Sequence, residues 1–311
     1  MGLLDGKVAI VTGAGNGVGR GEALELAAHG AKLVVNDLGG SVSGEGADKR
    51  VADEVVDIIT SRGGQAVANY DDVADFAGAK NIVDTAIEAF GRLDVLVNNA
   101  GILRDKMLFT MSEEDFDAVI RVHLKGTWNT MHHASVYWRG ESKAGRQPSA
   151  SIINTVSSAG LQGQVSQSNY GAAKAGIAAM TIIASLELAR YGVRANCIGP
   201  GGFTRMVGQA RADITVKNPE EYDTFDPMNP GNSAPAVAWL ASDASKPTTG
   251  QVVRLVGNNL CVYTPWQMGE QFEATDAEGK PRRWEAEEIG DVLNKYVFRT
   301  VNPGIAQQQR R

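Results

Sequence analysis

Cysteine is scarce in this sequence: the chain has only two, Cys197 and Cys261, and they form neither a CxxC pair nor a metal-ligand spacing. No run of lysine and arginine is long enough to form a basic face, and the formal net charge of −6 does not favour nucleic-acid binding. No stretch approaches the roughly 20 apolar residues that span a bilayer, and the first residues lack the regions of a signal peptide. We therefore expect no disulfide framework, metal site, nucleic-acid partner or membrane span, and we expect a cytoplasmic protein.

Glycine, by contrast, is abundant, with 36 residues, and many of them lie near the ends of strand-like segments. The hydrophobic share of 43% is ordinary for a globular protein with a real core. Glycines at strand ends favour a fold whose loops bring the backbone close to a ligand.

Short apolar segments alternate with segments of helical periodicity along most of the chain. Seven segments are expected to be strands: Lys7–Thr12, Ala31–Asn36, Gln65–Asn69, Leu93–Val97, Ser151–Val156, Val193–Ile198 and Gln251–Val256. Apolar strands separated by helices predict an α/β fold, a doubly wound, Rossmann-like parallel sheet of seven strands with helices on both faces. Such folds bind their ligand at the carboxyl ends of the strands.

Residues 259–311 follow the last expected strand, are more polar, and carry one helical stretch, Glu285–Val297. We therefore expect a single domain, residues 1–258, that holds both the cofactor and the substrate. Residues 259–311 are expected to form a C-terminal extension that serves as a lid or as an arm between subunits. The loop Gly202–Pro230 is expected to line the substrate pocket together with this extension.

A glycine-rich loop ends the first expected strand and leads directly into a helix. It contains Gly13, Gly15, Asn16, Gly17, Val18 and Gly19. The missing Cβ atoms allow a tight turn and let a pyrophosphate reach the free N–H groups of the helix N-terminus. Asp37, 18 positions after Gly19, ends the second expected strand, where its carboxylate can accept hydrogen bonds from a ribose. The combination predicts a dinucleotide site.

Asp37 also favours NAD over NADP, because a 2′-phosphate beside it would bring like charges together. Neither Asn16 nor Leu38, the residues flanking Gly17 and Asp37, supplies a cation. Lys49 and Arg50 are near enough along the chain to leave NADP open, and a turn or capping role for Asp37 is a further alternative.

Tyr170 and Lys174 are four residues apart and so share one face of a helix. A phenol has an ordinary pKa of about 10, and a nearby ammonium favours its ionised form. Tyr170 would then take a proton from an alcohol as hydride leaves the carbon, or return it in the reverse direction. Ser157, 13 residues earlier at a strand end, would hydrogen-bond the substrate oxygen. Alone, such a Tyr–Lys spacing is common among unrelated surface residues, so its weight comes from Ser157 and the glycine loop.

Together these motifs resemble the short-chain dehydrogenase/reductase family over about residues 5–257. The resemblance also covers Asp72-Val73, Asn98-Asn99-Ala100-Gly101 and Pro200-Gly201. It implies that Asp72 and Val73 contact the adenine and that Asn98, Asn99, Ala100 and Gly101 shape the cofactor cleft. It further implies that Pro200, Gly201 and Thr204 reach the nicotinamide end, and that the chain forms a homo-oligomer, a dimer or tetramer.

One position departs from the family pattern. His123 stands where the family has a fourth catalytic residue, an asparagine whose backbone carbonyl holds a water linked to the lysine. A backbone role survives this change, and whether the imidazole also relays protons is left open. The same histidine occurs in the (3R)-hydroxyacyl-CoA dehydrogenase domain of peroxisomal multifunctional enzyme type 2. The chain also resembles that domain in Val35–Gly40, Ala68–Asp71 and Asn98–Asp105.

These observations favour an NAD-dependent oxidoreductase of lipid metabolism that acts on a small-molecule secondary alcohol or ketone, a 3-hydroxyacyl-CoA or a hydroxysteroid. Two alternatives are an NADPH-dependent 3-oxoacyl reductase and a non-catalytic nucleotide sensor. The presence of Ser157, Tyr170 and Lys174 together argues against the sensor.

Overall fold

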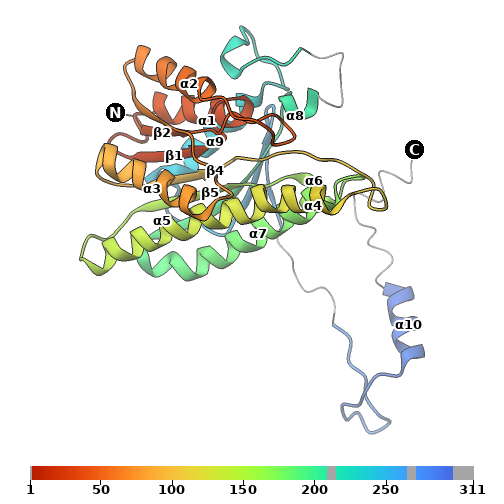
Figure 1. Ribbon diagram of the computed structural model, residues 1–311. Helices are drawn as coiled ribbons and strands as arrows, with labels where there is room; N and C mark the ends of the chain where they lie inside the picture. Colours follow the sequence, from red (N-terminus) through yellow and green to blue (C-terminus); the bar gives the residue numbers. More distant parts are fainter. Residues whose placement is uncertain (1, 209–214, 265–270, 297–311) are drawn as a thin grey trace. The chain divides into compact units, whose positions relative to one another are not determined.

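The computed structural model of the chain describes residues 2–208, 215–264 and 271–296. It divides into two compact units, Met1–Tyr263 and Thr264–Arg311. The first unit is built on one sheet with the strand order β3-β2-β1-β4-β5-β6-β7-β8 (Figure 1). The strands are β1 (Val8–Thr12), β2 (Lys32–Asn36), β3 (Gln65–Asn69), β4 (Val95–Asn98), β5 (Ala150–Thr155), β6 (Val193–Pro200), β7 (Val252–Val256) and β8 (Asn259–Tyr263).

Strands β1 to β7 pair in parallel and confirm the expected doubly wound sheet, but the sheet has eight strands rather than seven. Residues 259–263, which we had assigned to the C-terminal extension, form β8, antiparallel to β7. The turn between them is only Gly257-Asn258, and Gly257 has φ +56, which suits a two-residue hairpin. The strand lacks a buried apolar face, since Leu260 and Val262 are 64% and 58% exposed. Its sequence therefore shows no hydrophobic pattern that would predict a strand.

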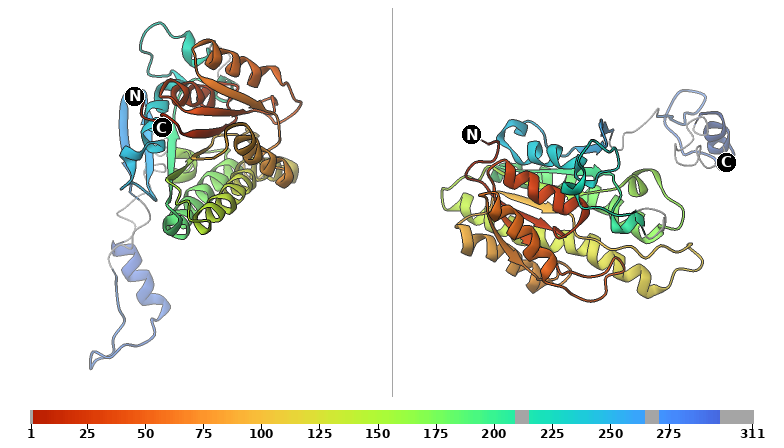
Figure 2. Two further views of the ribbon diagram at one scale, coloured as in Figure 1. Left: turned by 90° about the vertical axis from the view of Figure 1, so that its left-hand side faces the viewer. Right: turned by 90° about the horizontal axis from the view of Figure 1, so that it is seen from above.

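Helices cover both faces of the sheet (Figures 1 and 2). One face carries α1 (Gly17–Ala28), α2 (Arg50–Ser61) and α9 (Ala234–Ala241), and the other carries α3 (Phe76–Phe90), α5 (Gly126–Lys143) and α7 (Ser168–Leu188). Shorter helices are α4 (Glu113–Ile120), α6 (Ser158–Gln162) and α8 (Arg205–Gly208), and one π-helical turn, Arg121–Lys125, joins α4 to α5. Each apolar helix face packs on the alternate side chains of the buried strands, which forms a core on each side.

One helical segment, Ser168–Tyr191, is long and apolar enough to cross a membrane by length and composition, contrary to our expectation that no stretch approaches this. It consists of α7 and the turn after it, packs on β5 and β6, and buries Ala173, Lys174 and Ile177. The apolar side chains of this helix that face the sheet belong to the core, which accounts for the apolar composition of the segment.

The polypeptide reverses its winding direction between β1 and β4. Thr12, at the end of β1, pairs with Asn36 of β2 on one side and with Asn98 of β4 on the other. The loops that leave these three strands therefore begin at one level on either side of the switch point, where a doubly wound sheet binds its ligand.

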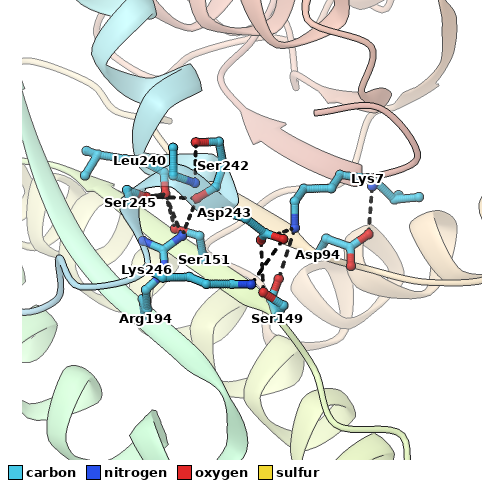
Figure 3. Close-up of polar contacts among 12 residues, drawn as sticks. Lys7, Asp94, Ser149, Ser151, Arg194, Leu240, Ser242, Asp243, Ser245 and Lys246 are labelled. Atoms are coloured by element: carbon cyan, nitrogen blue, oxygen red, sulfur yellow. Dashed lines mark hydrogen bonds and ion pairs between the residues drawn. The ribbon is translucent and has the colours of Figure 1, made fainter. Parts of the chain in front are cut away.

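At the opposite edge, a polar cluster ties α9 to the beginnings of the strands (Figure 3). Lys7 Nζ lies 3.0 Å from the carboxylate of Asp243, which also accepts from Ser149 Oγ at 3.0 Å. Arg194 donates to the carbonyl oxygens of Leu240 (2.9 Å), in the last turn of α9, and of Ser242 (3.1 Å), just after the helix. These bonds satisfy carbonyls that the helix end leaves unpaired.

The second unit contains α10 (Ala286–Tyr296), which confirms the helix expected over 285–297 within the described residues. A short bridge joins Thr275 to Pro281, and Arg282 is ion-paired with Glu288.

Candidate active site

A cavity of about 470 Å³ opens at the carboxyl ends of the central strands in the first unit. It is lined by most of the residues that the sequence singled out: Gly13, Asn16, Gly17, Val18, Asp37, Asp72, Val73, Asn99, Ala100, Gly101, His123, Ser157, Tyr170, Lys174, Pro200, Gly201 and Thr204. Gly15 and Gly19 do not line it. Segments far apart in the chain therefore meet around one space.

The glycine loop forms a cradle that a side chain would fill. Gly13 has φ +64, and a Cβ there would lie 2.7 Å from the Cα of Ala100. A Cβ on Gly19 would lie 2.3 Å from the carbonyl oxygen of Gly13, so this glycine serves helix packing rather than ligand contact. Asn16, the residue before α1, makes no capping bond, and its buried Nδ2 has no partner among the described residues. Unpaired donors at a helix N-terminus fit the pyrophosphate of a dinucleotide.

Asp37 is held by the backbone in front of this cradle. Its Oδ2 accepts a hydrogen bond from the N–H of Gly15 at 2.8 Å, and its Oδ1 accepts one from the N–H of Gly39 at 2.7 Å. The contribution of Gly15 is thus to fix the carboxylate. Two backbone hydrogen bonds therefore fix the Asp37 carboxylate at the cavity wall.

Asn98, the last residue of β4, and Asn99, just after it, have different roles. The Nδ2 of Asn99 donates to the carbonyl oxygens of Thr12 (3.1 Å) and Gly13 (3.0 Å), which anchors the glycine loop. Asn98 points the other way, with its Nδ2 donating to Asn154 at 2.8 Å and its Oδ1 accepting from Thr130 at 2.6 Å. Our expectation that Asn98 shapes the cleft directly is wrong, because alternate side chains along a strand face opposite sides of the sheet.

Asp72 and Val73 follow β3 at the side of the cavity. Asp72 lies 3.4 Å from the guanidinium of Arg121 and accepts a hydrogen bond from the N–H of Ala74 at 2.8 Å. The carbonyl oxygen of Val73 accepts a hydrogen bond from Asn129 at 2.9 Å. On the other side, Thr204 lies against the glycine loop, 3.2 Å from where a Cβ on Gly17 would be.

Ser157 and Tyr170 lie close together in the wall of the cavity. Burial raises the pKa of the Tyr170 phenol, while a hydrogen bond with the Ser157 side chain lowers it and the charge of Asp105 raises it. We had expected the ammonium of Lys174 to depress this pKa. In the protein alone burial dominates, and the contact that lowers the pKa of the phenol comes from Ser157.

Lys174 is buried beside the tyrosine, with its Nζ 5.6 Å from the centre of the Tyr170 ring. Its ammonium donates a hydrogen bond to the backbone carbonyl oxygen of Thr155 at 2.6 Å. Burial lowers the pKa of Lys174 to about 8, although Cys197 and Glu22 raise it. At neutral pH most of the Lys174 side chains are therefore still protonated.

His123 lies in the π-helical turn, fully enclosed, with its ring edge-on to Tyr170 at 5.1 Å between centres. Its Nε2 lies 2.8 Å from the carbonyl oxygen of Ile102 and 3.0 Å from the Ile102 nitrogen, so the tautomer decides whether it donates or accepts. Burial, followed by the charge of Lys174, lowers its pKa to about 3. The imidazole is therefore neutral, and its contacts are those of a group that positions the β4–α4 backbone.

Comparison with known proteins now identifies the family. The model of the short chain dehydrogenase family matches residues 7–215. This chain belongs to the short-chain dehydrogenase family. It is therefore an oxidoreductase that acts on CH–OH groups with a nicotinamide cofactor, and the glycine cradle and the donors of Asn16 fit such a cofactor.

Similar members of the short-chain dehydrogenase family include both short chains and parts of larger enzymes. Hydroxyacyl-CoA dehydrogenase ChsB1 of Mycobacterium tuberculosis is 40% identical over 94% of this chain and 89% of that protein. Peroxisomal multifunctional enzyme type 2 of Drosophila melanogaster is 45% identical over 77% of this chain, but the match spans only 37% of that protein. A crystal structure of a short chain dehydrogenase from Mycobacterium avium is 47% identical, with a TM-score of 0.83 over 97% of this chain and 98% of that one. Carveol dehydrogenase from Mycobacterium avium, solved in complex with NAD, is 27% identical, with a TM-score of 0.68 over 82% of this chain and 97% of that chain.

The loop after β2 is a part of this short-chain dehydrogenase's site that sequence reasoning missed. It folds onto the segment after β4, where the N–H of Leu103 donates to the carbonyl oxygen of Val42 and Arg104 donates to that of Ser43, each at 2.9 Å. Val42 and Leu103 both line the cavity. The glycine-rich composition of this loop indicated flexibility, and the partners that order it lie some 60 residues further along the chain.

Apolar side chains complete the cavity near the end of β6. Met206, Val207 and Met228 line it there, within the loop Gly202–Pro230 that we expected to form the substrate pocket. Residues 209–214 of that loop lie outside the described residues. No group of three histidine, cysteine or acidic side chains within the described ranges is placed to hold a metal ion.

Proposed function

We propose that this short-chain dehydrogenase uses NAD(H) to interconvert the hydroxyl and keto forms of a 3-hydroxyacyl-CoA. The observation that carries the proposal is the meeting of Ser157, Tyr170 and Lys174 in one cavity with the glycine cradle and Asp37. The full-length similarity to a protein named as a hydroxyacyl-CoA dehydrogenase supports the substrate class.

The choice of NAD is supported by the position of the Asp37 carboxylate and by the contacts of two cations, Lys49 and Arg50. Asp37 presents its carboxylate at the cavity wall, where it would repel a 2′-phosphate. The two cations that could have reversed this preference are engaged elsewhere. Arg50 is paired with Asp48 at 2.6 Å, and the ammonium of Lys49 lies 4.8 Å from the centre of the Tyr70 ring.

In the proposed oxidation, the substrate hydroxyl is hydrogen-bonded by Ser157 Oγ and gives its proton to Tyr170 Oη. The bound nicotinamide supplies the hydride acceptor. The work of Lys174 is to hold a positive charge next to the phenol, and the carbonyl of Thr155 holds the ammonium in place. The apolar side chains of Leu103, Met206 and Met228 favour an acyl chain in the remaining space.

Purified protein offered a panel of 3-hydroxyacyl-CoA esters, hydroxysteroids and simple secondary alcohols, each with NAD⁺ and NADP⁺, tests this proposal by the absorbance of the reduced cofactor. We expect turnover of the acyl-CoA esters with NAD⁺. Preference for NADP⁺ would indicate a 3-oxoacyl reductase instead. Firm NADH binding without turnover of any substrate would indicate a nucleotide sensor.

We also propose that the enzyme is a homo-oligomer. Large apolar side chains lie exposed along α5 and α7, among them Trp128 (46%), Val136 (58%), Ile183 (52%) and Leu186 (76%). Exposed apolar faces of this kind are typical of subunit contacts. Light scattering coupled to gel filtration tests this, and a monomer at micromolar concentration would contradict it.

A further inference from the structure

A carboxyl group lies buried in α1, and the reaction proposed above does not use it. Glu22 is 0% exposed, and neither of its carboxyl oxygens has a hydrogen-bond partner among the described residues. Val18, four residues earlier on the same side of the helix, lines the cavity. A buried carboxyl without partners destabilises a fold. Packing therefore does not explain why Glu22 lies one helical turn behind the cavity wall, and a functional role does.

The charged group that acts on Glu22 is the active-site lysine. Burial raises the pKa of Glu22 to about 8, and the charge of Lys174 lowers it. In turn, Glu22 is one of the two groups that raise the pKa of Lys174, after Cys197. The two buried groups therefore respond to each other, and the ionisation of one stabilises the charge of the other.

Other charges near α1 are already paired or turned away from Glu22. Within α1, Arg20 contacts Glu220 and Glu54, and Glu25 pairs with His29, the residue after the helix, at 3.3 Å. Of the elements packed against α1, β1, α9 and the turn Pro230–Ser233 contain no ionisable side chain. The turn Pro219–Glu221 also packs against α1 and contributes two carboxylates: Glu220 pairs with Arg20, and Glu221 accepts a hydrogen bond from the N–H of Asn218 at 3.0 Å. The ionisable side chains of β2 and α2 have other contacts or are exposed: Lys32 over Phe90, Arg50 with Asp48, Asp53 with Tyr70, and Asp57 exposed.

Two further unpartnered polar groups lie on the same side of the sheet. Thr155 is two residues after Ile153 in β5, so the two side chains lie on the same face of the sheet. Ile153 belongs to the core that α1 covers. Its Oγ1 is buried without a partner among the described residues, while its carbonyl oxygen holds Lys174. Ser233 Oγ, in the turn that packs on α1, is likewise buried and unpartnered in the described part of the chain. Hydroxyls of this kind can accommodate either the acid or the ionised form of a nearby carboxyl.

We propose that Glu22 is a positioning residue that acts through Lys174 and balances the positive charge entering the active site. With Lys174 protonated, binding of the oxidised cofactor adds a second positive charge to the cavity, and the Glu22 carboxyl then releases its proton to solvent. Binding of the reduced cofactor brings no such charge, so the carboxyl keeps its proton. The inference rests on the proposed NAD-dependent function, and it adds a proton-coupled preference for the oxidised cofactor.

The number of protons released on cofactor binding tests this directly. Calorimetric titrations with NAD⁺ and with NADH, each in two buffers of different ionisation enthalpy, give that number at a pH slightly below 8. We expect wild type to release more protons with NAD⁺ than with NADH, and Glu22→Gln to show a smaller difference, with the remainder coming from the Tyr170 phenol. Glu25→Gln, a carboxyl on the same helix that is paired with His29, is the matched control and should behave as wild type.

Unchanged proton release in Glu22→Gln, with both cofactors still bound, would overturn the inference and leave the proposed function intact. Failure of wild type to bind either cofactor would overturn both. Should Glu22→Gln fail to fold, infrared difference spectra of wild type with labelled glutamate give the same answer. Loss of a protonated-carboxyl band on adding NAD⁺, but not NADH, is the expected result, and its absence would refute the role of Glu22.

Discussion

Lys174 donates its hydrogen bond to the carbonyl oxygen of Thr155, at 2.6 Å, and not to the phenol of Tyr170. The lysine is thus anchored to the end of β5, with its Nζ 5.6 Å from the centre of the Tyr170 ring. Burial raises the pKa of Tyr170 in the protein alone. The positive charge of the bound cofactor is therefore needed to lower the pKa of the phenol so that it can act as a base.

The pH dependence of the oxidation should show that the bound cofactor lowers the pKa of the Tyr170 phenol. A raised pKa means that the free enzyme keeps the phenol protonated at neutral pH, so kcat/KM for NAD⁺, which reports the free enzyme, should rise toward alkaline pH. The kcat profile reports the loaded enzyme, and its acid limb should lie at lower pH because the cofactor's charge favours the phenolate. Steady-state kinetics across pH tests the claim, and coincident limbs would contradict it.

Asp37 is expected to determine the choice between the two cofactors. Replacing it with serine removes the negative charge that faces a 2′-phosphate and weakens the grip on the ribose. Hydrogen bonds to charged groups contribute about 1.5–3 kcal/mol, so NADH affinity should fall by about 10- to 100-fold while NADPH affinity stays level or rises. Fluorescence titration with both cofactors measures this, and an unchanged ratio of affinities would show that Asp37 does not discriminate.

His123 and Gly101 form a packed pair that can be tested by stability. A Cβ on Gly101 would lie 2.1 Å from Cε1 of the imidazole, so Gly101→Ala should lower the free energy of unfolding by about 1–3 kcal/mol. Gly140→Ala, where a Cβ meets nothing within 4 Å, is the control and should not destabilise. Adding His123→Ala to Gly101→Ala should recover part of the loss in urea denaturation. Purely additive effects would mean that the two positions do not interact.

The polar cluster at the far edge of the sheet predicts a loss of stability in acid. Burial raises the pKa of Asp243, but hydrogen bonds and charge from Lys7 outweigh it and lower the pKa to about 2. A lowered carboxyl pKa stabilises the fold above the ordinary value of 3.8, and this contribution disappears as the pH falls through 2. Because Asp243 is 54% exposed, Asp243→Asn should cost less than about 1 kcal/mol at neutral pH. Urea denaturation of both proteins should converge in strong acid, and a constant difference would rule out this ion pair as the cause.

The fold and the main site residues could be predicted because their signals are local. The glycine loop, Asp37, Ser157 and the Tyr170–Lys174 spacing each occupy a few consecutive positions at the end of an apolar strand or on one helix face. Their meeting in one cavity follows from the parallel order of the strands, which the alternation of strands and helices already implied.

What could not be predicted depends on contacts between distant segments. The carbonyl of Thr155 as the partner of Lys174, the folding of Val42 and Ser43 over the segment after β4, and the orientation of Asn98 away from the cavity all follow from tertiary packing. The eighth strand was missed for another reason: its side chains are exposed on the sheet edge, so no hydrophobic pattern marks it, although Gly257-Asn258 is a recognisable hairpin turn.

The most direct test of the account compares wild type with Tyr170→Phe in NAD⁺-dependent oxidation of a 3-hydroxyacyl-CoA. The variant keeps the ring and loses only the hydroxyl that takes the proton. General base catalysis contributes about 10²- to 10⁴-fold, so kcat should fall by at least that range while NADH binding, followed by fluorescence, stays within about twofold. A variant that oxidises the substrate at close to the wild-type rate would contradict the role assigned to Tyr170 and, with it, the proposed mechanism.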